Sequence, residues 1–297
     1  MVFSLHPRDY REEMRRLIIG ISEKARLTNS DFIVIPQNSV ILMYTRDGVL
    51  HEPFASHISG IGHEPLFSKN FPQEISHDVR ELQKVVSDGF PVWTIEYAAN
   101  YRDAKKLVND NKSNQFVTFV AEKRSLDSIP SDSEKLFTWS SKNIESISMV
   151  RNFLYLINPH RFKTLQAFEA AIQRTNFDAV VIDAYFMSRP ITKETVQLLK
   201  KKQNGNRRLV LAYMSIGEAE DYRYYWRSEW NTKRPAWIVA ENKKWKGNYS
   251  VRFWDKKWHA ILYKNVSSYI DKIVAAGFDG VYLDTIDVFM RFERGDL

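Results

Sequence analysis

Cysteine is absent from the 297 residues. This excludes disulfide bonds, thiolate metal sites and a cysteine nucleophile, and it leaves the compartment open. A run of the ~20 apolar residues that span a bilayer is also absent, so we expect no membrane span. The first residues, "MVFSLHPRDYREEMRRLIIG", lack a basic start followed by an apolar stretch, so no signal peptide is visible and the localisation stays unknown.

Several motifs that bind cofactors or carry catalysis are also missing. There is no GxGxxG or GxxxxGK[ST] phosphate loop, no HExxH pair and no GxSxG elbow. His51, His57 and His63 are spaced by six, which is not a metal-ligand spacing, and we interpret them as loop residues. We therefore expect no cofactor and no metal, since nothing in the sequence selects a divalent cation.

The charge balance is basic, with 43 Lys and Arg against 36 Asp and Glu and a net charge of +7. These basic residues are spread along the chain in short runs such as 200–202 and 243–244, without a helix-turn-helix, zinc-finger or RNP pattern. We interpret them as a solvated surface and expect no nucleic-acid partner. A nucleic-acid-associated protein is the alternative, and steeply salt-dependent retention of DNA or RNA would identify it.

What the sequence does contain is a large core. Hydrophobic residues make up 44% and aromatic residues 13%, enough for one α/β barrel or two modest domains and too many for a disordered chain. The 8 Trp and 14 Tyr suit a protein that stacks on flat or ring-shaped ligands, although a barrel of this size also needs many rings in its core.

Short apolar runs alternate with segments of helical periodicity. The runs are rich in Val, Ile and aromatic residues without alternation, which is typical of strands buried on both faces. Nine runs fit this description: 32–38, 58–64, 91–97, 116–122, 152–158, 178–185, 208–215, 236–241 and 278–285. Helical spacing is found between them, and Gly89, Gly205 and Gly277 follow three such segments.

Repeated strand–helix units, of which 179–215 with a helix at 192–202 is one, predict a parallel sheet covered by helices. A closed (β/α)8 barrel takes eight strands, so one of the nine runs is an extra strand or no strand. An open doubly wound sheet is the main alternative. The Ser-rich stretch 128–150, "SIPSDSEKLFTWSSKNIESISMV", is expected to be a linker or a loosely packed connection.

Acids and amides follow most of the predicted strands. In a parallel barrel the carboxyl ends of all strands lie on the face that carries active sites. Carboxylates that converge there raise each other's proton affinity, which is how paired carboxyls cleave glycosidic bonds. The alternative is that each acid caps the following helix. The residues in question are Gln37, Asn38, Glu64, Glu96, Asp183, Glu218, Glu241, Asp284 and Asp287.

Aromatic residues accompany these strand ends. Rings beside convergent carboxylates are typical of platforms on which sugars stack. The expected platform residues are Tyr97, Tyr185, Tyr213, Tyr222, Trp226 and Tyr282.

Several stretches resemble glycoside hydrolase family 114, the endo-α-1,4-polygalactosaminidase-like (β/α)8 barrels, and its bacterial relatives. The resemblance covers most of the chain outside 128–150, and its motifs are long enough to be specific. It is carried by "AYMSIGEAEDYRYYW" (212–226), "NYSVRFWDKKWHAILY" (248–263), "GFDGVYLDTID" (277–287), "REEMRRLIIGISEKARLTNSDFIVIPQNS" (11–39), "GIGHEPLF" (60–67) and "VWTIEYA" (92–98).

The order of these motifs differs from that of the family. The half of the family that contains "SIGEAE" and "GFDGVYLD" comes first there and last here. We therefore expect one circularly permuted barrel over 1–297, in which 1–127 is the family's C-terminal half, 128–150 joins the natural ends, and 151–297 is the N-terminal half. A fragment cut across two tandem copies is the alternative origin.

The resemblance implies roles for individual residues. Asp284 and Glu64 match the family's catalytic carboxylates, and the sequence does not say which of them is the acid. The resemblance also implies an endo-acting glycosidase on α-1,4-linked, partly deacetylated galactosaminoglycan. The residues expected to contact the sugar are Asp183, Tyr213, Glu218, Glu220, Arg223, Asn38, Glu96 and Asp287.

The expected partner is thus a polysaccharide or oligosaccharide, and we expect a monomer. Family members are typically secreted or surface-associated. A non-catalytic carbohydrate-binding barrel with the same acid-lined cleft is the second hypothesis. Replacement of Asp284 by Asn separates the two, because it abolishes hydrolysis in an enzyme and alters only binding in a binding protein.

Overall fold

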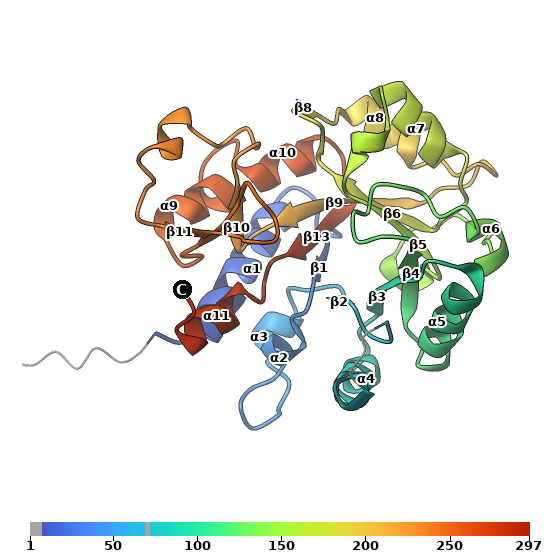
Figure 1. Cartoon of the computed structure of the whole chain (residues 1–297), viewed down its shortest axis with the longest axis horizontal. Coiled ribbons are helices and arrows are strands. Elements are labelled where there is room, and N and C mark those ends of the chain that lie inside the picture. The colour runs from blue at the N-terminus through green and yellow to red at the C-terminus, as the bar shows by residue number, and fades with distance from the viewer. Residues whose placement is uncertain (1–7, 69–71) are drawn as a thin grey trace, which may run out of the picture.

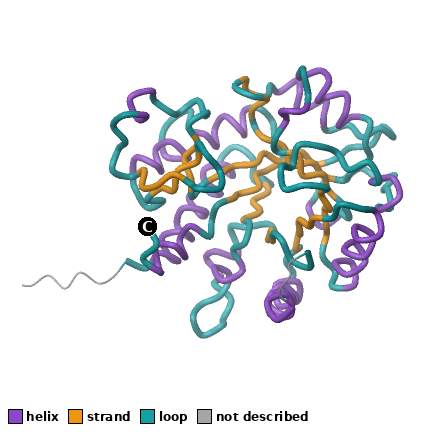
Figure 2. The backbone as a smooth tube through the Cα atoms, in the orientation of Figure 1, coloured by secondary structure: helices purple, strands orange, loops and turns teal. Residues whose placement is uncertain are grey.

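The computed structural model describes residues 8–68 and 72–297, and it shows a mixed α/β fold (Figures 1 and 2). Parallel strands occupy its centre and helices surround them. In chain order the central strands are β1 (Ile33–Pro36), β2 (Ile61–His63), β3 (Val92–Tyr97), β4 (Val117–Ala121), β5 (Phe153–Leu156), β6 (Ala179–Asp183), β9 (Leu209–Ser215) and β13 (Gly280–Asp284). Each lies within one of the apolar runs predicted to form strands.

Central strands that follow one another in the chain are neighbours in space, and the last central strand, β13, lies beside the first, β1. One sheet has the order β1-β13-β9-β6-β5 and another the order β2-β3-β4, and all the pairs in both are parallel. A parallel bridge between Gln37 and Gly62 joins β1 to β2. β4 lies beside β5, but within the described ranges no ladder connects them. The predicted parallel sheet is confirmed, whereas closure into a barrel stays a prediction.

The ninth predicted run is an extra strand outside the central sheet. β11 (Ile238–Glu241) pairs with β12 (Asn248–Val251), which in turn pairs with β10 (Glu218–Glu220), and both pairs are antiparallel. This small sheet lies in the long connection between β9 and β13. A two-stranded hairpin, β7 (Tyr185–Phe186) and β8 (Arg189–Pro190), follows β6.

The longest helix, α1 (Tyr10–Arg26), shows why these segments are helical. Asp9 caps its start by accepting a hydrogen bond from the Glu12 amide, and an apolar stripe faces the core through Met14, Leu17 and Ile18. The other helices of two or more turns are α4 (Pro72–Ser87), α5 (Tyr101–Ser113), α7 (Leu165–Gln173), α8 (Lys193–Leu199), α10 (Tyr269–Ala275) and α11 (Val288–Arg294).

Shorter helical segments connect these elements. The single-turn α-helices are α2 (Val40–Met43), α3 (Glu52–Ala55), α6 (Ser133–Leu136) and α9 (Lys256–His259). Three 3-10 turns span Ile147–Met149, Pro159–Arg161 and Ser228–Asn231, and a π-helical turn spans Ala260–Lys264. Among the described residues, no helix combines the length and apolar character needed to cross a bilayer.

The first and last helices lie side by side (Figure 1). The Arg11 Nε atom is 2.9 Å from Glu293 Oε1, and the Tyr10 ring stacks on Phe292 with centroids 5.5 Å apart. Because α11 follows β13 and α1 precedes β1, the two helices together occupy the place of a connection between these neighbouring strands.

Stretch 128–150 is irregular but not loosely packed. Lys202 reaches into it and donates to the Ser140 carbonyl, while its ammonium is 2.7 Å from Asp178 with both side chains fully buried. The Arg207 amide donates to Asn143, and Ile144 is buried in the core. The role of 128–150 as a joint between two halves stays a prediction, and its tight attachment comes from partners distant in the sequence.

Candidate active site

Two carboxylates meet at the carboxyl end of the central strands. Asp284 closes β13, and Glu64 follows β2 directly. The side-chain amide of Gln37, which follows β1 between them, donates to Glu64 Oε2 at 2.9 Å and to Asp284 Oδ1 at 3.1 Å. Because one nitrogen binds both, these two oxygens lie at most about 6 Å apart, a limit that admits the ~5–5.5 Å separation of the paired carboxyls in retaining glycosidases.

Glu64 is held by residues at the ends of two strands, β1 and β3, on either side of β2. The Tyr97 hydroxyl donates to Glu64 Oε1, and the Glu64 amide donates to the Asn38 side chain at 3.0 Å. Asn38 has a positive φ of 51°, a left-handed conformation that Asn tolerates better than most residues. In this conformation the Asn38 side chain points toward β2 and accepts from the Glu64 amide. Asn38 therefore orients Glu64 by binding the main chain of Glu64.

Asp284 accepts three hydrogen bonds and still has an elevated proton affinity. Tyr213 donates its hydroxyl to Oδ2 at 2.8 Å, and the Thr285 amide donates to Oδ1 at 2.7 Å. Burial and the negative charge of Glu64 raise the pKa of Asp284 to about 7, against the opposing effect of these hydrogen bonds. Asp284 therefore exchanges a proton near neutral pH, as a glycosidase acid does.

A second charged cluster lies at the end of β6. Arg223 binds Asp183 Oδ1 at 2.6 Å and Glu220 Oε2 at 2.5 Å, and the Tyr222 hydroxyl donates to Glu220 at 2.6 Å. Burial raises the pKa of Asp183, and Arg223 opposes this shift. Within the described residues, no group of three or more His, Asp or Glu is arranged to hold a metal ion.

Two of the expected sugar contacts lie beside the small antiparallel sheet. Glu218 is buried, and its Oε1 accepts from Asn242 at 3.0 Å. Burial raises the pKa of Glu218. Asp287 is exposed at the start of α11. Among the described residues Glu218 makes no hydrogen bond to Asp284 or Glu64, whereas the charge of Asp287 contributes to the raised pKa of Asp284. The structure thus brings together Asp284, Glu64, Tyr213 and Asn38, with Asp287 close enough to act on Asp284.

Glu96 differs from the expectation that it contacts sugar. Its side chain is fully buried and accepts from the Phe67 and Ser68 amides, the Ser68 hydroxyl and Asn111. These donors occupy both carboxylate oxygens. Glu96 therefore fixes the loop that follows Glu64, and its position at a strand end does not place it in contact with a ligand.

We predict that Glu96→Gln lowers the free energy of unfolding by about 1–3 kcal/mol, because an amide group replaces an acceptor facing backbone donors. Chemical denaturation measures this loss. Glu122→Gln is the matched control, since Glu122 is an exposed acid whose side chain accepts only from Ser131. Unchanged stability with a raised KM would instead identify a sugar contact.

The predicted aromatic platforms occupy different depths. Tyr282 is fully buried beneath the pair, and its hydroxyl fills the space where a side chain on Gly62 would lie. Tyr222, in contrast, is 55% exposed. Tyr185 is buried and stacks on the exposed Tyr224 at 5.7 Å, so Tyr224 and Tyr222 are exposed rings beside the Arg223 cluster on which a sugar can stack.

Gln37 was predicted only as an amide at a strand end and not as a residue of the catalytic or sugar-binding set, and Arg124 was not predicted at all. Arg124 follows β4 by three residues in an exposed polar stretch, and nothing in the sequence distinguishes it from neighbouring Lys123. Its nearness to Glu64, with an NH2–Oε1 distance of 4.0 Å, depends on the order of the strands.

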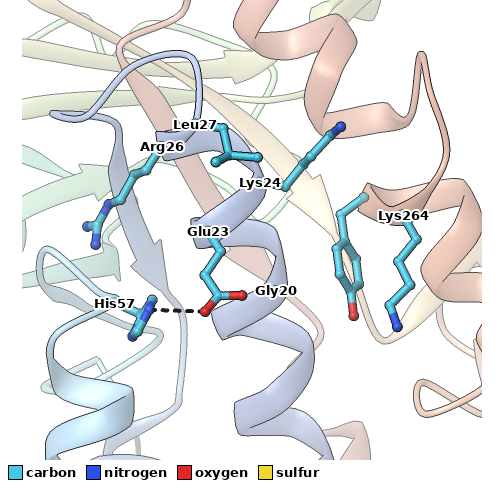
Figure 3. A pocket seen from close by; sticks show the side chains of 8 residues that line it. Gly20, Glu23, Lys24, Arg26, Leu27, His57 and Lys264 are labelled. Carbon is cyan, nitrogen blue, oxygen red and sulfur yellow. Dashed lines mark ion pairs between the residues drawn. The ribbon is translucent and has the colours of Figure 1, made fainter.

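A hollow of about 660 Å³ lies elsewhere, on the outer side of α1 (Figure 3). Its lining includes Glu23, His57, Tyr263 and Lys264, and none of the carboxylates described above. His57 Nε2 is 3.6 Å from Glu23 Oε1, so these two lining side chains face one another. We therefore assign the chemistry to the strand ends and not to this hollow.

Comparison with known families supports the glycosidase assignment. The sequence model of the glycoside-hydrolase family GH114 matches residues 156–297. This stretch contains Asp183, Tyr213, Arg223 and Asp284, while Glu64 lies outside it. Over this stretch the chain is thus similar to the glycoside hydrolases of that family.

Three uncharacterised proteins are similar to parts of the chain. One from Methanocaldococcus jannaschii is 36% identical over 174 residues, which are 56% of this chain and 47% of that protein. One from Deinococcus radiodurans is 43% identical over 87 residues, 29% of this chain and 27% of that protein. One from Thermotoga maritima is 46% identical over 79 residues, 27% of this chain and 23% of that protein. The matches thus span about half or less of each relative.

Proposed function

We propose that the protein is a family 114 glycoside hydrolase of the bacterial branch, endo-acting on α-1,4-linked, partly deacetylated galactosaminoglycan. The observation that carries the proposal is the carboxylate pair bridged by Gln37, in which Asp284 has a pKa of about 7. The family match over the half of the chain that contains Asp284 supports it.

The proton affinity of the pair suggests how the roles divide. Asp284 holds a proton up to about neutral pH and is the proposed acid, which protonates the glycosidic oxygen as its bond to the anomeric carbon breaks. Glu64 is then the proposed nucleophile and forms a bond to that carbon. Water next attacks the same carbon and gives its proton to Asp284, which releases Glu64 and a hydrolysed sugar.

The spacing of the carboxylates supports retention of anomeric configuration. The two bridged oxygens are at most about 6 Å apart, a limit that lies below the ~6.5–9.5 Å of inverting enzymes and admits the ~5–5.5 Å of retaining ones. Proton NMR of the first product formed tests this point. A newly formed α-anomer agrees with retention, and a β-anomer contradicts it.

The charge at the strand ends supports an amino-sugar substrate. Asp183 and Glu220 both bind the buried Arg223, and the charges of Glu220 and Asp284 both act on Tyr213. A galactosamine ammonium is attracted to such acids, whereas the net charge of +7 repels a polycation at long range. Local charge must therefore prevail over net charge.

We also propose that the chain is one circularly permuted barrel, with 1–127 and 151–297 as the exchanged halves and 128–150 as the joint. The family match in the later half supports this arrangement. So does the position of α11 and α1 in the place of a connection between β13 and β1. The side between β4 and β5, which lacks a ladder within the described residues, is where 128–150 joins the halves.

The test of the proposed function is digestion of α-1,4-galactosamine oligomers of graded acetylation, with the products sized by mass spectrometry. A mixture of internal fragments is expected from an endo-acting enzyme. Tight binding of the oligomers by folded protein without any shortening would instead identify a carbohydrate-binding barrel.

A further inference from the structure

The guanidinium of Arg124 lies beside the proposed nucleophile, Glu64, and most of its N–H donors have no protein acceptor among the described residues. It packs over the Tyr97 ring at 4.9 Å from the centroid, and its NH2 atom is 4.0 Å from Glu64 Oε1. That oxygen is the one to which the Tyr97 hydroxyl donates. In the part of the chain that the structure describes, Arg124 donates no hydrogen bond to a protein acceptor.

The exposure of Arg124 separates it from the structural ion pairs of the molecule. Its side chain is 61% exposed, whereas that of Glu64 is 15% exposed. An exposed pair at 4.0 Å adds little to folding stability, because solvent screens it. The guanidinium is therefore a cation held at the edge of the site, with its N–H donors available to a ligand.

Arg223 and Arg124 differ in burial and in how far neighbouring acids neutralise their charge. Arg223 is buried and bound by Asp183 and Glu220, which neutralise it. Glu64 is the acid beside Arg124 and, at 4.0 Å, neutralises its charge only in part. A sugar that approaches from the side of Arg124 therefore meets an exposed positive charge. An ammonium group there is repelled, whereas a carbonyl oxygen accepts a hydrogen bond from the guanidinium.

We propose that Arg124 is a specificity-determining residue that selects an N-acetylated sugar over a free-amine sugar at the position flanking Glu64. The inference rests on the proposed function and deepens it. The glycan is then read with opposite preferences on two sides of the scissile bond. On one side, the Arg223 cluster contains two acids and one arginine and binds a sugar with a free amine. On the other side, Arg124 binds the acetyl carbonyl of an N-acetylated sugar.

The test compares Arg124→Gln and Arg124→Glu with wild type on galactosamine oligomers that are fully acetylated, fully deacetylated or mixed. Tandem mass spectrometry identifies the sugars on both sides of each cut. Wild type is expected to prefer an acetylated sugar on one side by about tenfold. Arg124→Gln should remove that preference, and Arg124→Glu should reverse it in favour of the amine.

Lys123→Gln is the matched control, because Lys123 is an exposed cation next in sequence that has no interaction with Glu64 or Tyr97. It should retain the wild-type preference. Equal loss of rate on all oligomers in both Arg124 variants would overturn the proposal and leave Arg124 as a support for Tyr97.

A separate measurement keeps this inference distinct from the proposed function. If wild type cleaves no oligomer, calorimetric binding of the acetylated and deacetylated oligomers replaces the rates. A binding preference that Arg124→Glu reverses would support the inference although the hydrolase proposal had failed. Cleavage without any acetyl preference, or binding without one, would overturn the inference alone.

Discussion

Replacement of Glu64 by Gln or of Asp284 by Asn is expected to lower kcat/KM for oligosaccharide cleavage by about 10³-fold or more. Each change keeps the shape of the side chain and removes the group that attacks carbon or transfers a proton. Replacement of Glu64 also removes the negative charge that helps to raise the pKa of Asp284. Initial rates on a defined oligomer measure the effect.

The two variants are expected to differ on substrates with a good leaving group. Such a substrate needs little protonation, so Asp284→Asn should recover much of its rate on an activated aryl glycoside, and Glu64→Gln should not. Glu145→Gln is the control, since Glu145 is an exposed acid that makes no contact with the pair. Recovery by Glu64→Gln alone would reverse the roles, and wild-type rates in both variants would refute the pair.

Asp284→Asn is expected to stabilise the protein at pH 8. The folded-state pKa of about 7 lies above the unfolded value of about 4, so the folded protein holds a proton that the unfolded chain releases. The contribution of Asp284 to stability is complete below pH 4 and is lost as the pH rises through 7. This loss has an upper bound of about 4 kcal/mol, at 1.36 kcal/mol per pKa unit.

Asparagine cannot ionise and therefore escapes this loss. Its carbonyl can accept from Gln37 and Thr285, and its amide can donate to the Tyr213 hydroxyl. We expect a gain of about 2–4 kcal/mol over wild type at pH 8 and almost none at pH 4, from urea denaturation at both values. A gain of equal size at both pH values would show that Asp284 does not titrate between them.

The parallel strands were predictable because a strand that is buried on both faces has a simple sequence pattern. Runs such as 178–185 and 278–285 are apolar without alternation, and β6 and β13 lie within them. The run 236–241 has a similar composition, yet β11 is an antiparallel strand of a peripheral sheet whose residues are only partly buried. Local composition cannot separate the two, since the difference lies in which strand each one meets.

The site was predictable to the extent that its residues follow strands. Asp284 and Glu64 share that signal and lie together, whereas Tyr213, which donates to Asp284, lies inside β9. Glu96 shares it as well, but its side chain turns toward the loop at Phe67 and Ser68. The sequence marks the end of a strand and does not give the direction of the side chain, which packing with distant residues decides.

Hydrolysis in water labelled with oxygen-18 tests the central claim most directly. A glycosidase that uses the Asp284–Glu64 pair adds one solvent oxygen for each bond that it cleaves. Mass spectrometry of the wild-type digest should show shortened galactosamine oligomers with one labelled oxygen at each new reducing end, and the Glu64→Gln digest should show none. Intact oligomers after incubation with folded wild-type protein, or shortened oligomers without label, would contradict the account.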